Sequence, residues 1–82
     1  METLRDTVGG MLSNDYKERL RAEYYQVKIR YGSLCRILQK WKEGKLDFTP
    51  PSPMDLMEEQ ADVMYNYMKI LEVRAQNEEV KL

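Results

Sequence analysis

The sequence predicts an all-α protein, an antiparallel two-helix hairpin that assembles into a homo-oligomeric helical bundle. Apolar side chains recur at alternating spacings of three and four residues in two long stretches, and a proline-rich break separates these stretches. This spacing places the side chains on one face of a helix, and such a face needs a packing partner. The first stretch contains Leu20, Tyr24, Val27, Tyr31, Leu34, Leu38 and Trp41, and the second contains Met57, Ala61, Met64, Met68, Leu71 and Ala75.

The chain length limits the size of the core. With 82 residues the protein forms one domain, and a single core of this size supplies only about 3–5 kcal/mol. We therefore expect self-association to add stability. We divide the chain into an N-terminal arm or short helix, residues 1–14, and a helical hairpin, residues 15–82. Gly9 and Gly10 interrupt the helical spacing of the arm.

Local signals place the first helix at about residues 15–43. Asp15 begins this helix in a capping-box pattern with Glu18, which would satisfy two unpaired backbone N–H groups. Gly44 follows the last turn, where glycine commonly ends a helix. The loop after it, residues 44–52, is stiff because it is rich in proline.

The second helix is predicted over about residues 53–78. Ser52 before a proline is a favourable helix start. We expect Leu46 and Phe48 of the loop to cover the open end of the hairpin, because they alternate with polar residues. The polar tail that runs to Leu82 is expected to fray.

The second helix also carries a second stripe, one residue before the first. A helix that is apolar over so wide an arc needs two neighbours. We therefore expect it to pack on the first helix and on another subunit. The stripe contains Leu56, Gln60, Val63, Tyr67, Ile70 and Arg74.

The net charge is −1, but the charges are unevenly divided between the two helices. Residues 16–45 contain nine Lys or Arg against three Glu, a local charge of +6, and residues 46–82 contain eight acidic against three basic side chains, a charge of −5. Two interpretations stay open. In the first, the two helices form a charge-matched hairpin, although exposed ion pairs contribute only about 0–1 kcal/mol each. In the second, part of the basic helix attracts an anionic ligand.

The side chains that catalysis and metal binding require are largely missing. The chain has no histidine, which removes Ser-His-Asp and Cys-His catalysis, and it shows no glycine-rich phosphate loop or metal-ligand spacing. Cys35 is better explained as a small apolar filler than as a nucleophile. We predict a protein that is not an enzyme, with no catalytic residue, metal or cofactor. Without a secretion signal or an apolar run near the roughly 18 residues of a membrane span, we expect it to be cytoplasmic, with no membrane partner.

Aromatic and basic side chains remain as candidates for binding. Six tyrosines are a high count for this length, and tyrosine rings can stack on bases at about 1–3 kcal/mol each, while Lys and Arg bind phosphate. The neutral net charge gives no track for extended nucleic acid, so a small anionic nucleotide fits better. The predicted ligand-binding residues are Arg21, Tyr24, Tyr25, Lys28, Arg30, Tyr31, Gln60, Tyr67 and Arg74.

Other interpretations of these positions stay open. Tyr24 and Tyr31 also fit the apolar seam, with their hydroxyl groups at its rim. Tyr25 lies off the seam beside Lys28 and is either an oligomer contact or a ligand platform. Gly32 costs the helix about 1 kcal/mol against alanine, and it marks either a close approach or a mild defect.

A set of short motifs extends over residues 16–82. It comprises Tyr16-Lys-Glu-Arg-Leu20, Glu23-Tyr24, Arg30-Tyr31, Leu46-Asp-Phe-Thr-Pro50, Glu59-Gln60, Met64, Tyr67 and Ile70-Leu-Glu-Val-Arg-Ala75. In these motifs the chain resembles small helical proteins of bacterial viruses and prophages that are related to a short protein of crAss-like phages. The resemblance implies a phage-encoded helical protein and assigns no activity.

Compact helical phage proteins without catalytic residues include sponges, oligomers that sequester the nucleotide signals of bacterial antiviral defence. By this analogy of fold and setting, we expect a homo-oligomer that binds a cyclic or ADP-ribose-type nucleotide signal at subunit interfaces in the host cytoplasm. The alternative is a helical adaptor or inhibitor that binds a host or viral protein through the exposed face of the first helix.

Overall fold

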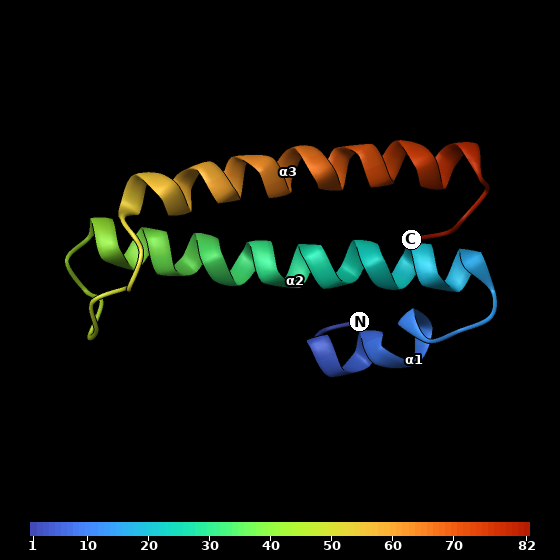
Figure 1. The fold of residues 1–82 in the computed structure, drawn as a ribbon, viewed down its shortest axis with the longest axis horizontal. Helices are drawn as coiled ribbons and strands as arrows, with labels where there is room; N and C mark the ends of the chain where they lie inside the picture. Colours follow the sequence, from blue (N-terminus) through green and yellow to red (C-terminus); the bar gives the residue numbers. More distant parts are fainter.

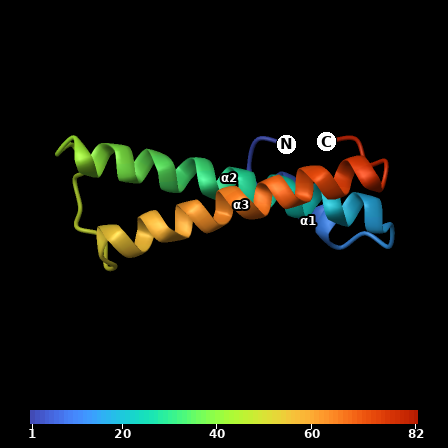
Figure 2. The ribbon, with the colours of Figure 1, turned by 90° about the horizontal axis from the view of Figure 1, so that it is seen from above.

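The computed structural model describes all 82 residues and contains helices but no strand. A short 3₁₀ helix, η1 (Leu4–Thr7), leads into α1 (Val8–Met11), and two long helices follow, α2 (Tyr16–Lys42) and α3 (Met54–Asn77). The long helices lie side by side in opposite directions (Figure 1) and cross each other when seen from above (Figure 2). The predicted all-α hairpin is confirmed, and its long helices begin and end within one residue of the predicted positions.

Helix α2 begins at the predicted cap, but the predicted capping box is wrong in its second half. The Asp15 carboxylate accepts a hydrogen bond from the Lys17 N–H at 2.9 Å. Glu18 does not reach back to the backbone of Asp15 and instead accepts a hydrogen bond from the Ser13 hydroxyl at 2.6 Å. The serine therefore ties the loop before α2 to its first turn.

Gly44 ends α2 as predicted. Its φ is +70°, and its N–H donates to the Trp41 carbonyl at 3.0 Å while the Lys45 N–H donates to the Lys40 carbonyl at 2.8 Å. Glycine suits this left-handed conformation because it has no Cβ. The chain can then turn sharply from α2 into the linker, residues 43–53.

The predicted cap at the start of α3 is wrong. Pro53, and not Ser52, occupies the cap position, and no side chain caps the helix. Asp55 accepts a hydrogen bond from the Leu56 N–H at 2.9 Å. The start of α3 therefore rests on the fixed φ of the proline and on an acidic side chain in the first turn, which suits the helix dipole.

The core follows the seam between α2 and α3. Every predicted seam residue is buried or half-buried, and Leu71, at 1% exposed, is the most enclosed of them. Thr7 of the N-terminal segment and Pro50 of the linker are also buried. The buried apolar residues are Leu20, Ala22, Tyr24, Val27, Leu38, Ala61, Met68, Leu71, Ala75 and Val80.

The N-terminal segment, residues 1–12, packs on the side of α2 that faces away from α3 (Figure 1). Gly10 makes the closest approach, since a Cβ there would lie 2.9 Å from the Ala22 Cβ and 3.2 Å from the Glu18 carbonyl oxygen. Thr7 is 1% exposed, and its hydroxyl donates to the Leu4 carbonyl at 2.7 Å. The segment is therefore a short helical layer on α2.

The C-terminal tail, residues 78–82, folds back onto α2 (Figure 1), so the prediction that it frays is wrong. Glu79 adopts a left-handed φ of +57°, and Val80, which follows it, is buried in the core. The Arg21 Nε donates to the Lys81 carbonyl at 2.7 Å, and the Tyr25 hydroxyl donates to the Leu82 carbonyl. Burial of an apolar side chain together with these two bonds holds the tail.

A hydrogen bond from a buried tyrosine joins the two long helices. The Tyr24 hydroxyl donates to the Glu72 carboxylate at 2.7 Å. Burial of Tyr24, together with the acceptor carboxylate, raises the pKa of Tyr24 to about 12. The hydrogen bond from Tyr24 lowers the pKa of Glu72 below its ordinary value of 4.5. The bond is therefore strongest when the tyrosine is neutral and the glutamate is ionised.

Gly10→Ala should destabilise the protein by about 1–3 kcal/mol, because the added methyl group would overlap Ala22. Urea unfolding followed by circular dichroism measures this change. Gly9→Ala is the matched control, since nothing lies within 4 Å of a Cβ at that position and alanine is favoured over glycine in a helix. If the two variants are equally stable, the N-terminal segment does not pack on α2 in solution.

Tyr24→Phe should lower the free energy of unfolding at pH 7 by about 1–2 kcal/mol, because the hydrogen bond to the Glu72 carboxylate is lost. In the parent, this contribution is lost as the pH rises from 10 through about 12, and again as the pH falls below 4.5 and Glu72 is protonated. Tyr16→Phe, at an exposed tyrosine, is the control. Unfolding curves measured across pH for Tyr24→Phe should lack the loss at high pH and show a smaller loss at low pH, since Lys69 still lowers the pKa of Glu72. Curves that still match the parent would contradict this.

Candidate functional site

Helix α2 gathers several of the predicted ligand-binding residues near its N-terminal end. The Tyr24 and Tyr25 rings meet edge to face, with centroids 5.3 Å apart. The Lys28 Nζ lies 5.9 Å and 5.7 Å from the two ring centroids, within the range of cation–π attraction. We call Tyr24, Tyr25 and Lys28 the tyrosine–lysine cluster, and Arg21 lies one turn before it.

Most polar groups of this region already have partners within the chain. The Tyr24 hydroxyl is bound to Glu72, and Arg21 and Tyr25 hold the backbone of the C-terminal tail. The Lys28 ammonium takes part in none of the salt bridges. Lys28 and the face of Tyr25 are therefore the parts of the cluster best placed to meet a ligand.

Arg30 and Tyr31 lie apart from the cluster. Arg30 is exposed, and because it follows Lys28 by two residues it lies on a nearly opposite face of α2. Tyr31 is half-buried in the seam, with its ring centroid 6.1 Å from that of Tyr65. A hydrogen bond with Cys35 raises the pKa of Tyr31. Of the two roles that the sequence left open for Tyr31, the structure therefore shows the one in the apolar seam.

Gln60, Tyr67 and Arg74 are exposed along α3. The Arg74 guanidinium pairs at 2.9 Å with Glu78, the residue that follows α3, and this hydrogen-bonded pair raises the pKa of Arg74 and lowers that of Glu78. No hydrogen bond or salt bridge joins this row to the tyrosine–lysine cluster. The structure thus does not bring the predicted residues together: Arg21 lies with the tyrosine–lysine cluster, the row on α3 lies apart from it, and Arg30 and Tyr31 belong to neither group.

Helix α3 leaves much of the positive charge of α2 unpaired. Of the four salt bridges, only Lys42–Glu58, at 3.2 Å, crosses between the two long helices. Lys28, Arg36 and Lys40 take part in none of them. The charge-matched hairpin therefore rests on one direct ion pair, and a basic face of α2 remains available to an anion.

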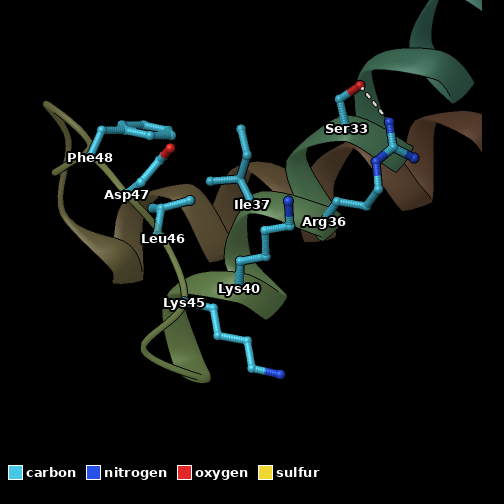
Figure 3. Close-up of a pocket in the computed structure, with 8 residues that line it drawn as sticks. All are labelled: Ser33, Arg36, Ile37, Lys40, Lys45, Leu46, Asp47 and Phe48. Carbon is cyan, nitrogen blue, oxygen red and sulfur yellow. Dashed lines mark hydrogen bonds between the residues drawn. The ribbon is translucent and has the colours of Figure 1, made fainter.

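A cavity of about 360 Å³ opens on this basic face, between the second half of α2 and the linker (Figure 3). We call it the linker cavity. The Lys40 side chain extends toward Arg36 and Ile37, while the Lys45 ammonium points away from the other labelled side chains (Figure 3). The lining residues are Ser33, Arg36, Ile37, Lys40, Lys45, Leu46, Asp47 and Phe48.

A neighbouring cavity of about 250 Å³ lies between the N-terminal segment and α2. Arg36 lines both cavities, so they follow one another along the helix. Gly32 lies in the wall of the second cavity, and a Cβ there would meet only the Arg36 Nη1, at 3.7 Å. No backbone approaches Gly32 closely. The residues of this second cavity are Met1, Glu2, Tyr25, Lys28, Ile29, Gly32 and Arg36.

Sequence reasoning did not find the linker cavity. Ser33, Arg36, Ile37 and Lys40 recur at helical spacing and therefore share a face of α2, but nothing in that spacing shows where the linker passes. Phe48 was expected to cover the open end of the hairpin, yet it is 52% exposed and lies at the edge of the cavity. The linker contributes Pro50 to the interior instead.

The predicted second stripe of α3 is exposed in the single chain. Leu56, Val63 and Ile70 are 53%, 62% and 59% exposed. A shallow apolar groove of about 450 Å³ runs along part of this stripe beside Gln60 and Met64. We call Leu56, Val63, Tyr67 and Ile70, with this groove, the apolar stripe of α3.

Neither a metal site nor a membrane span emerges from the structure. No group of three or more His, Cys, Asp or Glu side chains is placed to hold a metal ion. None of the helices combines the length and the apolar character that crossing a membrane would require.

Comparison with known proteins places the hairpin in a family. No curated protein and no solved structure matches the chain. The sequence profile of the Sequestin family matches residues 14–77, which contain α2, the linker and the whole of α3. The family name indicates a sequestering role, which is binding rather than catalysis. Since the match covers most of the chain, this protein belongs to the Sequestin family.

Proposed function

We propose that this protein is a phage-encoded sponge that sequesters a small anionic nucleotide, a cyclic or ADP-ribose-type immune signal, in the host cytoplasm. The observation that carries the proposal is the basic face of α2, where Lys28, Arg36 and Lys40 have no ion-pair partner and lie beside aromatic rings and two cavities. Membership of a family named for sequestration agrees with it.

Sequestration requires the protein to bind the signal and not to react with it. It requires cations for phosphate, aromatic faces for bases and enough affinity to lower the free concentration of the signal. It needs no nucleophile, general base or metal. The Tyr25 ring supplies a stacking face, and the Lys28 ammonium, 5.7 Å from its centroid, supplies a charge beside it.

The apolar stripe of α3 supports binding at subunit interfaces. Contiguous apolar patches on a small protein usually mark an interaction surface. A second copy packed on this stripe would bury Val63 and Ile70 in a two-fold symmetric contact. Gln60, Tyr67 and Arg74 lie along the same row, so such an assembly would bring two copies of them together at the contact between subunits.

The alternative function, an adaptor or inhibitor, was expected to use the exposed face of α2, and the stripe of α3 offers it a second surface. A foreign helix with an apolar face could occupy the groove beside Val63. The two functions differ in what the protein binds. A sponge binds nucleotides without another protein, whereas an adaptor binds a protein and no nucleotide.

Calorimetric titration with cyclic dinucleotides, cyclic trinucleotides and ADP-ribose derivatives should identify a ligand of the parent protein. Tyr25→Ala should then weaken binding by about 1–3 kcal/mol, the contribution of one stacked base. Tyr25→Phe is the matched control, because it keeps the ring and removes only the hydroxyl that holds the C-terminal tail. Equal affinities for Tyr25→Ala and the parent would move the site elsewhere.

Lys28→Ala should reduce the salt dependence of the same binding, because it removes a phosphate contact. Lys69→Ala serves as its control, since Lys69 also lies over a tyrosine, 5.2 Å from the Tyr65 centroid, but is paired with Glu72. A parent protein that binds none of these nucleotides would favour the adaptor.

Ile70→Asp should dissociate the oligomer, because it places an unpaired charge in an apolar interface. Light scattering of the purified protein at tens of micromolar measures the mass. Val73→Asp is the control, since Val73 is equally exposed, at 55%, but lies off the apolar stripe of α3. The finding that the parent is a monomer at this concentration would contradict the proposed assembly.

A further inference from the structure

We infer that the linker cavity binds the phosphate-bearing end of a nucleoside diphosphate group, with Arg36 and Lys40 on the phosphates and Phe48 against the base. The inference rests on the proposed function and adds to it a site that the sequence did not predict. It is carried by the combination of cations, an aromatic ring and a carboxylate in one cavity.

The α2 side of the cavity supplies positive charge. Arg36 and Lys40 are one helical turn apart, which places them as neighbours on the surface of α2. The Arg36 Nη2 donates to the Ser33 hydroxyl at 3.2 Å, and its other donors are left for a ligand. Arginine and lysine hydrogen-bond phosphate strongly because donor and acceptor are both charged.

Lys45 contributes less to this wall. Its ammonium is 3.9 Å from the Glu43 carboxylate, and both side chains are largely exposed. It also points away from the cavity (Figure 3). The recognition of phosphate therefore depends on Arg36 and Lys40.

The linker side of the cavity supplies groups that suit the base and the ribose of a nucleotide rather than its phosphates. Phe48 is 52% exposed and presents a ring on which a base can stack. Asp47 also lines the cavity and forms no salt bridge with its cations. Its carboxylate only accepts hydrogen bonds, so it suits the hydroxyl groups of a ribose or the amino group of a base and repels inorganic phosphate.

The cavity is formed before any ligand binds. Gly44 turns the chain at the end of α2, and buried Pro50 with the other prolines stiffens the linker. Its volume of about 360 Å³ lies within the usual range of small-molecule sites. Arg36 also lines the cavity that contains Lys28, so a longer ligand can extend from the linker cavity toward the tyrosine–lysine cluster.

The test is calorimetric titration of the full chain with ADP and, separately, with pyrophosphate. Lys40→Ala should weaken ADP binding about tenfold and make the remaining binding less sensitive to salt, because one charged contact to phosphate is lost. Lys42→Ala is the matched control, because Lys42 lies in the same part of α2 but pairs with Glu58 across the hairpin. It should leave ADP binding unchanged.

Phe48→Ala separates base stacking from phosphate binding. It should weaken ADP binding about five- to tenfold and leave any pyrophosphate binding unchanged. Phe48 is more than half exposed, so the variant keeps the fold, which circular dichroism checks.

Three results would overturn the inference: a parent that does not bind ADP, a Lys40→Ala variant that binds ADP as tightly as the parent, or equal losses in Lys40→Ala and Lys42→Ala. The proposed function fails on a different result, a parent that binds no cyclic or ADP-ribose-type nucleotide. A parent that binds such a signal with the same affinity after Lys40→Ala and Phe48→Ala would therefore keep the proposed function and refute this site.

Discussion

The apolar seam between α2 and α3 is the contact on which the rest of the structure depends. Isolated helices are marginal in water, and most of their stability in proteins comes from packing an apolar face. Here Leu71, at 1% exposed, is the most enclosed residue of the seam, and the small side chains of Ala61 and Ala75 are buried in the same seam. Because the seam uses one side of α2, the remaining sides are free to meet the N-terminal segment, the C-terminal tail and solvent.

Helix α2 is therefore the common support of the fold. Its first half is enclosed by α3, by the N-terminal segment at Ala22 and by the tail at Arg21 and Tyr25. Its second half packs on α3 and on the linker, and there the cations Arg36 and Lys40 border a cavity. Charge that would repel another helix is tolerated at this end because solvent, or an anionic ligand, can reach it.

The two exposed surfaces suit different partners. The basic face of α2 combines cations with rings and hollows, which are features of a site for small anionic ligands. The stripe of α3 is apolar and shallow around Val63 and Ile70, which suits a protein surface. A sponge that assembles through α3 would keep the basic face of every α2 open to the signal.

The sequence by itself determined the helices and their seam. The signals were the spacing of apolar residues, Asp15 before α2 and Gly44 after it. Each of them acts on residues that are close in the chain, so it can be recognised without knowing the fold. The predicted cap at Ser52 was wrong because Pro53 occupies the cap position. Residue spacing alone does not decide which of two adjacent residues caps a helix.

Only the tertiary structure decided how distant segments meet. The tail turns back because Val80 is buried in the core and Arg21 donates a hydrogen bond to the Lys81 carbonyl. The linker cavity exists because the path after Gly44 brings Leu46, Asp47 and Phe48 to face the side of α2 that carries Arg36 and Lys40. Such contacts join residues far apart in the chain, and their energy depends on the relative placement of whole elements, which no local pattern contains.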